Sequence, residues 1–182
     1  MSKRLQWPVD KLVFLDESAS NERTGYRKRG WSPVGTSCTE LVTIKWHNRW
    51  SILPALTING YLPNPLIFQG GVTKELFLWF VRYRVLPHVQ PGYILVLDNA
   101  SIHHSDEVKD LCFEAGVALE YLPPYSPDLN PIEQTFNVLK AWIRRHMHEA
   151  QWYADFGRFL VYAVDMAIGD VKGHFHESGY EV

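Results

Sequence analysis

The chain has 182 residues, of which 46% are hydrophobic and 21% charged, and its formal net charge is −2. This length and composition predict a single domain, residues 1–182, and the lack of a basic excess confines any nucleic-acid contact to local patches. The two cysteines, Cys38 and Cys112, form no Cys-x-x-Cys pair, which argues against a zinc site or a disulfide framework. No apolar run has the length of a signal peptide core or a membrane span, so we expect a soluble, intracellular protein without membrane contact.

The first third of the chain predicts an antiparallel meander. A short apolar run ends abruptly at Asp16, which is typical of a buried strand that closes on an acid. Pro54 cannot donate to a ladder, so the strand that contains it is expected to be bulged or to lie at an edge. A loop rich in proline and glycine follows, over residues 63–71. The expected strands cover residues 12–15, 24–31, 40–46 and 50–58.

Helices and strands alternate in the rest of the chain. The apolar run 93–97 ends at Asp98, so a second buried strand also closes on an acid. Asn130 and Pro131 are typical of a helix N-cap followed by proline in the first turn. The tail 169–182 shows no recognisable chemistry. The expected helices cover residues 73–86, 105–116, 131 onward and 152–168, and the expected strands cover residues 93–97 and 117–122. This order predicts an α/β fold, a mixed sheet flanked by helices.

Three acids are placed to form a site. Asp16 and Asp98 end two strands, and Glu133 lies in the first turn of the helix that begins at Pro131. Ligands in such sheets gather where strands end, so these carboxylates are expected to converge. Two charges about 5 Å apart repel by roughly 3 kcal/mol at an effective dielectric of about 20, so the cluster requires a cation. Oxygen-only ligation selects Mg²⁺ or Mn²⁺, and two such ions fit hydrolysis or transfer of a phosphodiester.

Two stretches around these acids resemble motifs of mariner-like DDE transposases. The acid spacing from Asp98 to Glu133 is 133 − 98 = 35 positions, or 34 intervening residues, a spacing that this superfamily uses. The matching stretches are Leu97-Asp98-Asn99-Ala100-Ser101-Ile102-His103 and Tyr125-Ser126-Pro127-Asp128-Leu129-Asn130-Pro131-Ile132-Glu133. In addition, Leu15-Asp16-Glu17-Ser18 resembles the first acid motif, and Gly30-Trp31-Ser32-Pro33-Val34-Gly35 resembles the strand that follows it. The likeness runs from about residue 11 to about residue 148.

The resemblance implies a ribonuclease H-like domain that cuts transposon ends and joins 3′-hydroxyls to target DNA. In that role Asp16 and Asp98 share the metal ions, Glu133 completes the site and His103 lies close to the cleft. By this resemblance we expect residues 1–182 to contain the catalytic domain and none of the helix-turn-helix modules that precede it in this family. A separate domain is then expected to recognise the DNA. The chain is also expected to form a homodimer. In a eukaryotic host its expected location is the nucleus.

Several basic or titratable residues are candidate DNA contacts, each with a plainer interpretation. The basic run Arg27, Lys28 and Arg29 is equally well explained as an edge strand protected by charge. The cations Lys140 and Arg144 could equally form a solvated helix face. For His103 and His104, a surface position before a helix is favoured over metal ligation, because the rest of the site is oxygen. The candidates are Arg27, Lys28, Arg29, His103, Lys140 and Arg144.

Each acid also has a structural explanation on its own. Asp16 and Asp98 suit turns after strands, and Glu133 suits a capping box in which it reaches back to the amide of Asn130. A catalytically idle, domesticated or degraded transposase-derived module that binds DNA or protein remains the alternative function. A phosphatase acting through phosphoaspartate is disfavoured, because no second Asp stands two residues after Asp16 or Asp98.

Overall fold

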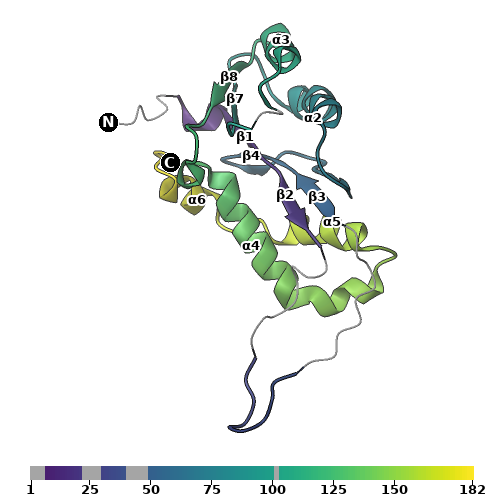
Figure 1. Ribbon diagram of the computed structural model, residues 1–182. Coiled ribbons are helices and arrows are strands. Elements are labelled where there is room, and N and C mark those ends of the chain that lie inside the picture. The colour runs from purple at the N-terminus through teal and green to yellow at the C-terminus, as the bar shows by residue number, and fades with distance from the viewer. Residues whose placement is uncertain (1–6, 22–29, 40–48, 101–102) are drawn as a thin grey trace.

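The computed structural model describes residues 7–21, 30–39, 49–100 and 103–182. Within these residues the strands form a five-stranded sheet in the order β5-β4-β1-β7-β8 and a three-stranded sheet in the order β2-β3-β6 (Figure 1). β1 pairs with β7 in parallel and with β4 antiparallel, and β7 pairs with β8 in parallel. The expected mixed sheet is therefore confirmed.

The strands are β1 (Leu12–Leu15), β2 (Ser18–Ser20), β3 (Trp50–Leu53), β4 (Ala55–Thr57), β5 (Gly60–Tyr61), β6 (Leu66–Gln69), β7 (Ile94–Leu97) and β8 (Ala118–Tyr121). The α-helices are α2 (Lys74–Phe80), α3 (Asp106–Glu114), α4 (Pro131–His146), α5 (Phe156–Met166) and α6 (Val171–Glu177). A π-helical turn, η2 (Val81–Val85), continues α2, and short 3₁₀ turns are η1 (Val9–Lys11), η3 (Leu86–His88), η5 (Pro127–Leu129) and η6 (Met147–Trp152).

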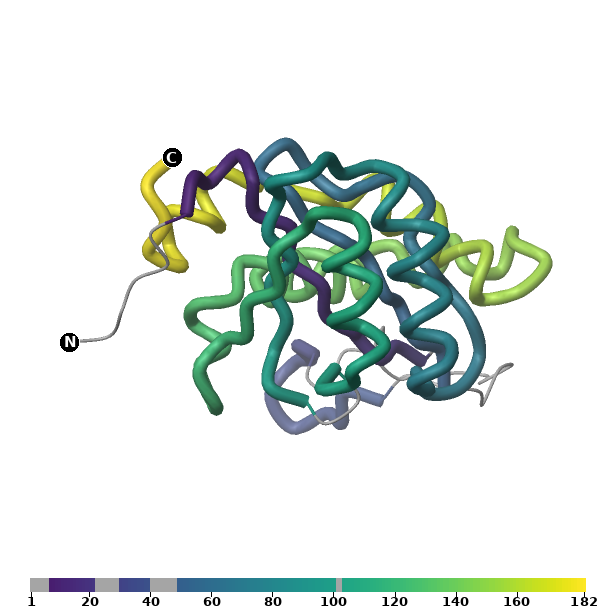
Figure 2. Tube along the Cα trace, turned by 90° about the horizontal axis from the view of Figure 1, so that it is seen from above, coloured from purple at the N-terminus to yellow at the C-terminus, as the bar shows by residue number. Residues whose placement is uncertain are grey.

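Helices cover both faces of the five-stranded sheet, with α2 and α3 on one side and α4 and α6 on the other (Figures 1 and 2). Side chains alternate along β1, so Val13 and Leu15 pack toward α2 and α3, whereas Leu12 and Phe14 pack toward α4 and α6. All four are fully buried, which explains why this strand is a continuous apolar run. The central strands therefore form a rigid platform for the residues that follow them.

Pro54 marks the point where the chain passes from one sheet to the other. β3 ends at Leu53 and pairs with β2 and β6, and β4 begins at Ala55 and pairs with β1 and β5. Both strands are central in their sheets, so the edge position expected for Pro54 is wrong. The strand is interrupted instead, because proline has no N–H for a ladder.

Other parts of the meander differ from the sequence-based expectation. Residues 24–29 and 40–46 of the two expected strands lie outside the described residues. The stretch 30–35, expected to form a strand, leads into a turn in which Thr36 N–H donates to Pro33 O (3.0 Å) and Gly35 has φ +88°. The loop expected over residues 63–71 contains β6, which pairs with β3.

The expected helices are confirmed, with differences at the ends of two of them, and one further helix is present. The helix expected over residues 73–86 changes to a π-helical turn after Phe80. The helix expected over 152–168 begins later, at Phe156, because Asp155 accepts a hydrogen bond from Arg158 N–H and caps it (2.9 Å). The tail 169–182, for which no helix was predicted, contains α6. No helix in the described part of the chain is long and apolar enough to cross a membrane.

Helix α6 contributes a core residue, so its loss is expected to destabilise the domain. Phe175 is fully buried and lies edge-on to the ring of Phe14 from β1, with centroids 5.4 Å apart. We expect Phe175→Ala to lower the free energy of unfolding by about 3–5 kcal/mol, because it leaves a cavity against the central strand. Urea unfolding measures this, and Phe113→Ala is the matched control because Phe113 is 86% exposed. Equal stability of the two variants would contradict the placement of α6.

Candidate active site

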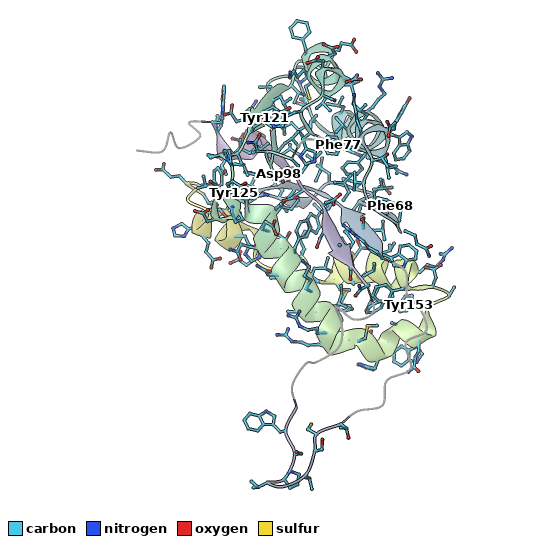
Figure 3. All side chains as sticks on the ribbon, in the orientation of Figure 1. Phe68, Phe77, Asp98, Tyr121, Tyr125 and Tyr153 are labelled. Atoms are coloured by element: carbon cyan, nitrogen blue, oxygen red, sulfur yellow. The ribbon has the colours of Figure 1, made fainter. Side chains whose placement is uncertain are left out.

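The parallel pairing of β1 and β7 brings the first two acids together. Leu15 is the register partner of Leu97, so Asp16 and Asp98 follow neighbouring strand ends. Glu133 lies in the first turn of α4, and all three acids line one pocket of about 420 Å³. Asp98 and Tyr125 lie beside the first turns of this helix (Figure 3). The remaining lining residues are Asn99, Ala100, Leu122, Pro123, Pro124, Ser126, Pro127 and Asn130.

Asp16 is the most buried of the three acids, with 7% of its surface exposed. Its Oδ1 accepts the N–H of Glu17 (2.7 Å), and its Oδ2 accepts the Nδ2–H of Asn130 (2.8 Å). Burial, followed by repulsion from Glu133 and Asp98, raises the pKa of Asp16 from 3.8 to about 7. The ionised form is therefore disfavoured unless a positive charge enters the pocket.

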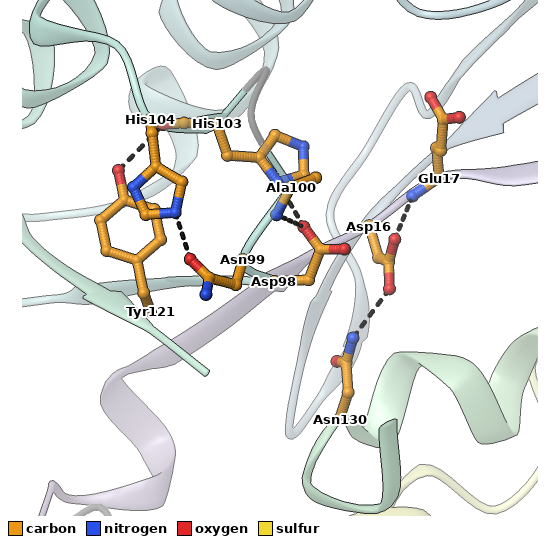
Figure 4. A network of polar contacts seen from close by, with 9 residues as sticks. All are labelled: Asp16, Glu17, Asp98, Asn99, Ala100, His103, His104, Tyr121 and Asn130. Carbon is orange, nitrogen blue, oxygen red and sulfur yellow. Dashed lines mark hydrogen bonds and ion pairs between the residues drawn. The ribbon is translucent and has the colours of Figure 1, made fainter. Parts of the chain in front are cut away.

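Asp98 has a different environment, because a histidine supports it. His103 Nδ1 lies 2.6 Å from Asp98 Oδ1, and Ala100 N–H donates to the same oxygen (3.1 Å; Figure 4). The contact with His103 is the main cause that lowers the pKa of Asp98, against the effect of partial burial. His103 is itself buried and packs on the ring of Phe77. Only 2% of the surface of His103 is exposed.

The structure also settles how Asn130 and Glu133 are used at the start of α4. The N–H of Asn130 donates to Pro127 O (3.1 Å), so it is not engaged by Glu133 in a capping box. Asn130 occupies the N-cap position, but its side chain accepts no capping hydrogen bond. Its amide instead donates to Asp16, which sequence reasoning missed because asparagine before proline is also typical of a simple helix start.

The donor set fits a hard divalent cation. The three acids that line the pocket offer carboxylate oxygens, and burial together with repulsion from Glu133 and Asp98 raises the pKa of Asp16, so a cation there would favour its ionised form. Among the described residues, no three His, Cys, Asp or Glu side chains are drawn together closely enough to form a preassembled metal site.

The candidate DNA contacts lie at different distances from the pocket. Lys140 and Arg144 are 7 and 11 residues after Glu133 on α4, which places them about 10 and 17 Å along the helix axis. Neither lines the pocket, and Arg144 is exposed. The basic run Arg27, Lys28 and Arg29 lies outside the described residues.

Solved structures with the same architecture were found by comparison. The Mos1 strand transfer complex is 15% identical with a TM-score of 0.61, covering 94% of this chain and 56% of that chain. A mariner Mos1 paired-end complex with Mg is 15% identical with a TM-score of 0.57, covering 96% and 57%. A simian T-cell lymphotropic virus intasome in complex with PP2A regulatory subunit B56 gamma is 11% identical with a TM-score of 0.55, covering 91% and 50%.

These matches show the fold, a ribonuclease H-like mixed sheet flanked by helices. Residues 11–152 match the family model described as DDE superfamily endonuclease, and the chain therefore belongs to that family. The chain spans about half the length of the solved chains it matches. No curated protein shows significant similarity to it.

Proposed function

We propose that the chain is the metal-dependent catalytic domain of a mariner-like transposase. In this role it cleaves phosphodiester bonds at transposon ends and joins 3′-hydroxyls to target DNA. The observation that carries the proposal is the shared pocket of Asp16, Asp98 and Glu133, built on two adjacent strand ends and one helix start in a chain of this family. Structures of similar fold hold DNA ends and, in one case, Mg.

Each acid has a separate task in this proposal. Asp16 and Asp98 hold the metal from the sheet, and Glu133 completes the site from α4. Bound divalent ions, two in number, would activate the attacking hydroxyl at phosphorus and stabilise the leaving oxygen. His103 keeps the Asp98 carboxylate ionised and oriented from below. The proline loop from Pro123 to Pro127 forms a stiff wall of the pocket against which a DNA strand can be held.

DNA is the proposed partner, bound at the mouth of this pocket. Lys140 and Arg144 are proposed to follow the backbone away from the cut site along α4, since phosphate contacts fix register without reading sequence. Arg27, Lys28 and Arg29 have the charge for the same task. Recognition of transposon ends is proposed to come from a separate domain or from a second copy of the chain, and the proposed location in a eukaryotic host is the nucleus.

A nicking assay on supercoiled plasmid tests the proposed reaction directly. We expect purified protein to convert supercoiled DNA to the open circle in Mg²⁺ or Mn²⁺, and to leave it intact in EDTA, because without a divalent ion nothing in the site activates water or stabilises the leaving oxygen. Gel electrophoresis of a time course measures the rate. Cleavage that persists at the same rate in EDTA would contradict a metal-dependent site.

The alternative is an idle, domesticated descendant that binds DNA or protein through this domain. It is favoured by one observation, the lack of a preassembled three-ligand group among the described residues. Calorimetric titration with Mn²⁺ separates the two functions. A working site gives a saturable heat of Mn²⁺ binding, whereas an eroded one gives no saturable heat.

A further inference from the structure

The buried side chain of Asn130 links Asp16, which directly follows β1, to α4, the helix that carries Glu133. Asn130 is 3% exposed, and its Nδ2–H donates to Asp16 Oδ2 (2.8 Å). The carbonyl of the same residue accepts the N–H of Glu133 (3.1 Å). Asn130 is therefore bonded to two of the three acids, once through its side chain and once through its backbone. Its position sets the spacing between them.

The orientation of this amide follows from the chemistry of its partner. A carboxylate that holds a cation is ionised and only accepts hydrogen bonds, which matches the observed orientation, in which Asn130 Nδ2–H donates to Asp16 Oδ2. The amide oxygen then points away from Asp16 (Figure 4). That oxygen is buried and has no hydrogen-bond partner, although Asn130 lines the pocket.

Helix capping does not account for this oxygen. At an N-cap, asparagine normally uses its side-chain oxygen to accept an N–H from the first turn, and here it makes no such bond. A buried acceptor without a partner lowers the stability of the fold by about 1–3 kcal/mol. Helix capping does not compensate for this loss at Asn130. A donor that arrives from the pocket would remove that cost.

We propose that Asn130 is a positioning residue of the metal site, an inference that rests on the proposed function. Its amide N–H orients the Asp16 carboxyl group beside the start of α4, and its buried oxygen would accept a hydrogen bond from a water of the bound cation. Mg²⁺ retains several of its waters in protein sites, and these waters are donors that need acceptors in the outer shell. Each Asp16 oxygen accepts one hydrogen bond from the protein, which leaves further lone pairs for the ion.

Calorimetric titration of Mn²⁺ into the metal-free protein tests the proposal. We expect Asn130→Ala to weaken Mn²⁺ binding about 10–100-fold, the usual effect of losing an outer-shell partner. Asn130→Ser should weaken it to a similar extent, since serine caps a helix as well as asparagine does but is too short to reach Asp16. Asn137→Ala is the matched control, the same substitution at an exposed position of the same helix, and should bind as the wild type does.

The Mn²⁺ dependence of plasmid nicking gives a second readout that a purely structural role would not move. We expect the Asn130 variants to need about 10–100-fold more Mn²⁺ for half-maximal nicking, and to regain most of the rate at saturation, because the three acids are still present. A lower rate with unchanged Mn²⁺ dependence would overturn the proposal.

The outcomes separate this inference from the function on which it rests. If both Asn130 variants bind Mn²⁺ as tightly as the wild type, the inference is overturned and the proposed function stands. If both variants fail to fold without metal, as judged by circular dichroism, Asn130 is a structural residue and the inference is also overturned. If the wild type itself neither binds Mn²⁺ nor nicks DNA, both the proposed function and the inference about Asn130 are overturned.

Discussion

Replacing Asp98 by Asn is expected to abolish DNA nicking while leaving the fold intact. The variant keeps the size of the side chain, and its amide oxygen can still accept the N–H of Ala100, so β7 and the turn after it should be unchanged. It loses the negative charge that a divalent ion requires. Loss of an outer-shell partner alone costs about 10–100-fold, so loss of a direct ligand should lower the nicking rate by at least roughly 100-fold.

The rate of plasmid nicking in Mg²⁺ measures this effect, with thermal unfolding as the check on the fold. Asp106→Asn is the matched control, because Asp106 is an exposed acid on α3 whose ion pair with Lys109 lies at the surface. Surface pairs of this kind contribute about 0–1 kcal/mol, so the control should nick as the wild type does. Unchanged nicking by Asp98→Asn in a clean preparation would remove Asp98 from the mechanism.

The parts of the fold that the sequence predicts are those whose signals are local. The apolar runs that become β1 and β7 are buried on both faces, and Ser105 caps α3 through the N–H of Val108, as expected from its place before the apolar periodicity. The same features place Asp16 and Asp98 at strand ends. Only the pairing of the two strands, which is a tertiary property, makes the acids neighbours.

The elements that escaped prediction are ordered by contacts with distant parts of the chain. β2 is Ser-Ala-Ser and lacks β-branched residues, yet it pairs with β3. α6 has seven residues and packs through Phe175 on β1. The bond from Asn130 to Asp16 spans 114 positions, and no local pattern distinguishes it from ordinary capping. Sequence reasoning therefore proposed the three acids, which line one pocket, and missed the side chain of Asn130 that contacts Asp16.

Replacing Asp16 by Asn is expected to make the metal-free protein more stable at neutral and alkaline pH. Because the folded-state pKa of Asp16, about 7, lies above the 3.8 of the unfolded chain, the protonated side chain stabilises the fold below about pH 4. This contribution is lost as the pH rises through about 7. At 1.36 kcal/mol per unit of pKa, ionisation of Asp16 costs up to about 4 kcal/mol at pH 8.

Asparagine at position 16 avoids that cost, since it has the shape of the protonated acid and does not ionise. Its amide oxygen can accept the N–H of Glu17, and its amide N–H can donate to the unpartnered oxygen of Asn130 once that amide turns over. We expect the variant to gain about 2–4 kcal/mol at pH 8 in EDTA, a rise in Tm of about 2–4 °C per kcal/mol, with the gain shrinking toward pH 4.

Thermal unfolding at a series of pH values, with and without Mn²⁺, measures both the pH dependence of stability and the stabilisation by the metal. The wild type should gain about 2.7 kcal/mol at a Mn²⁺ concentration 100 times its Kd, and the Asp16→Asn variant should gain little, because its metal ligand is gone. Asp165→Asn, at an exposed position of α5, should respond to pH and Mn²⁺ as the wild type does. A metal-free Asp16→Asn variant less stable than the wild type at pH 8 would show that the buried carboxylate is satisfied by its hydrogen bonds alone, and the electrostatic argument for a cation would fail.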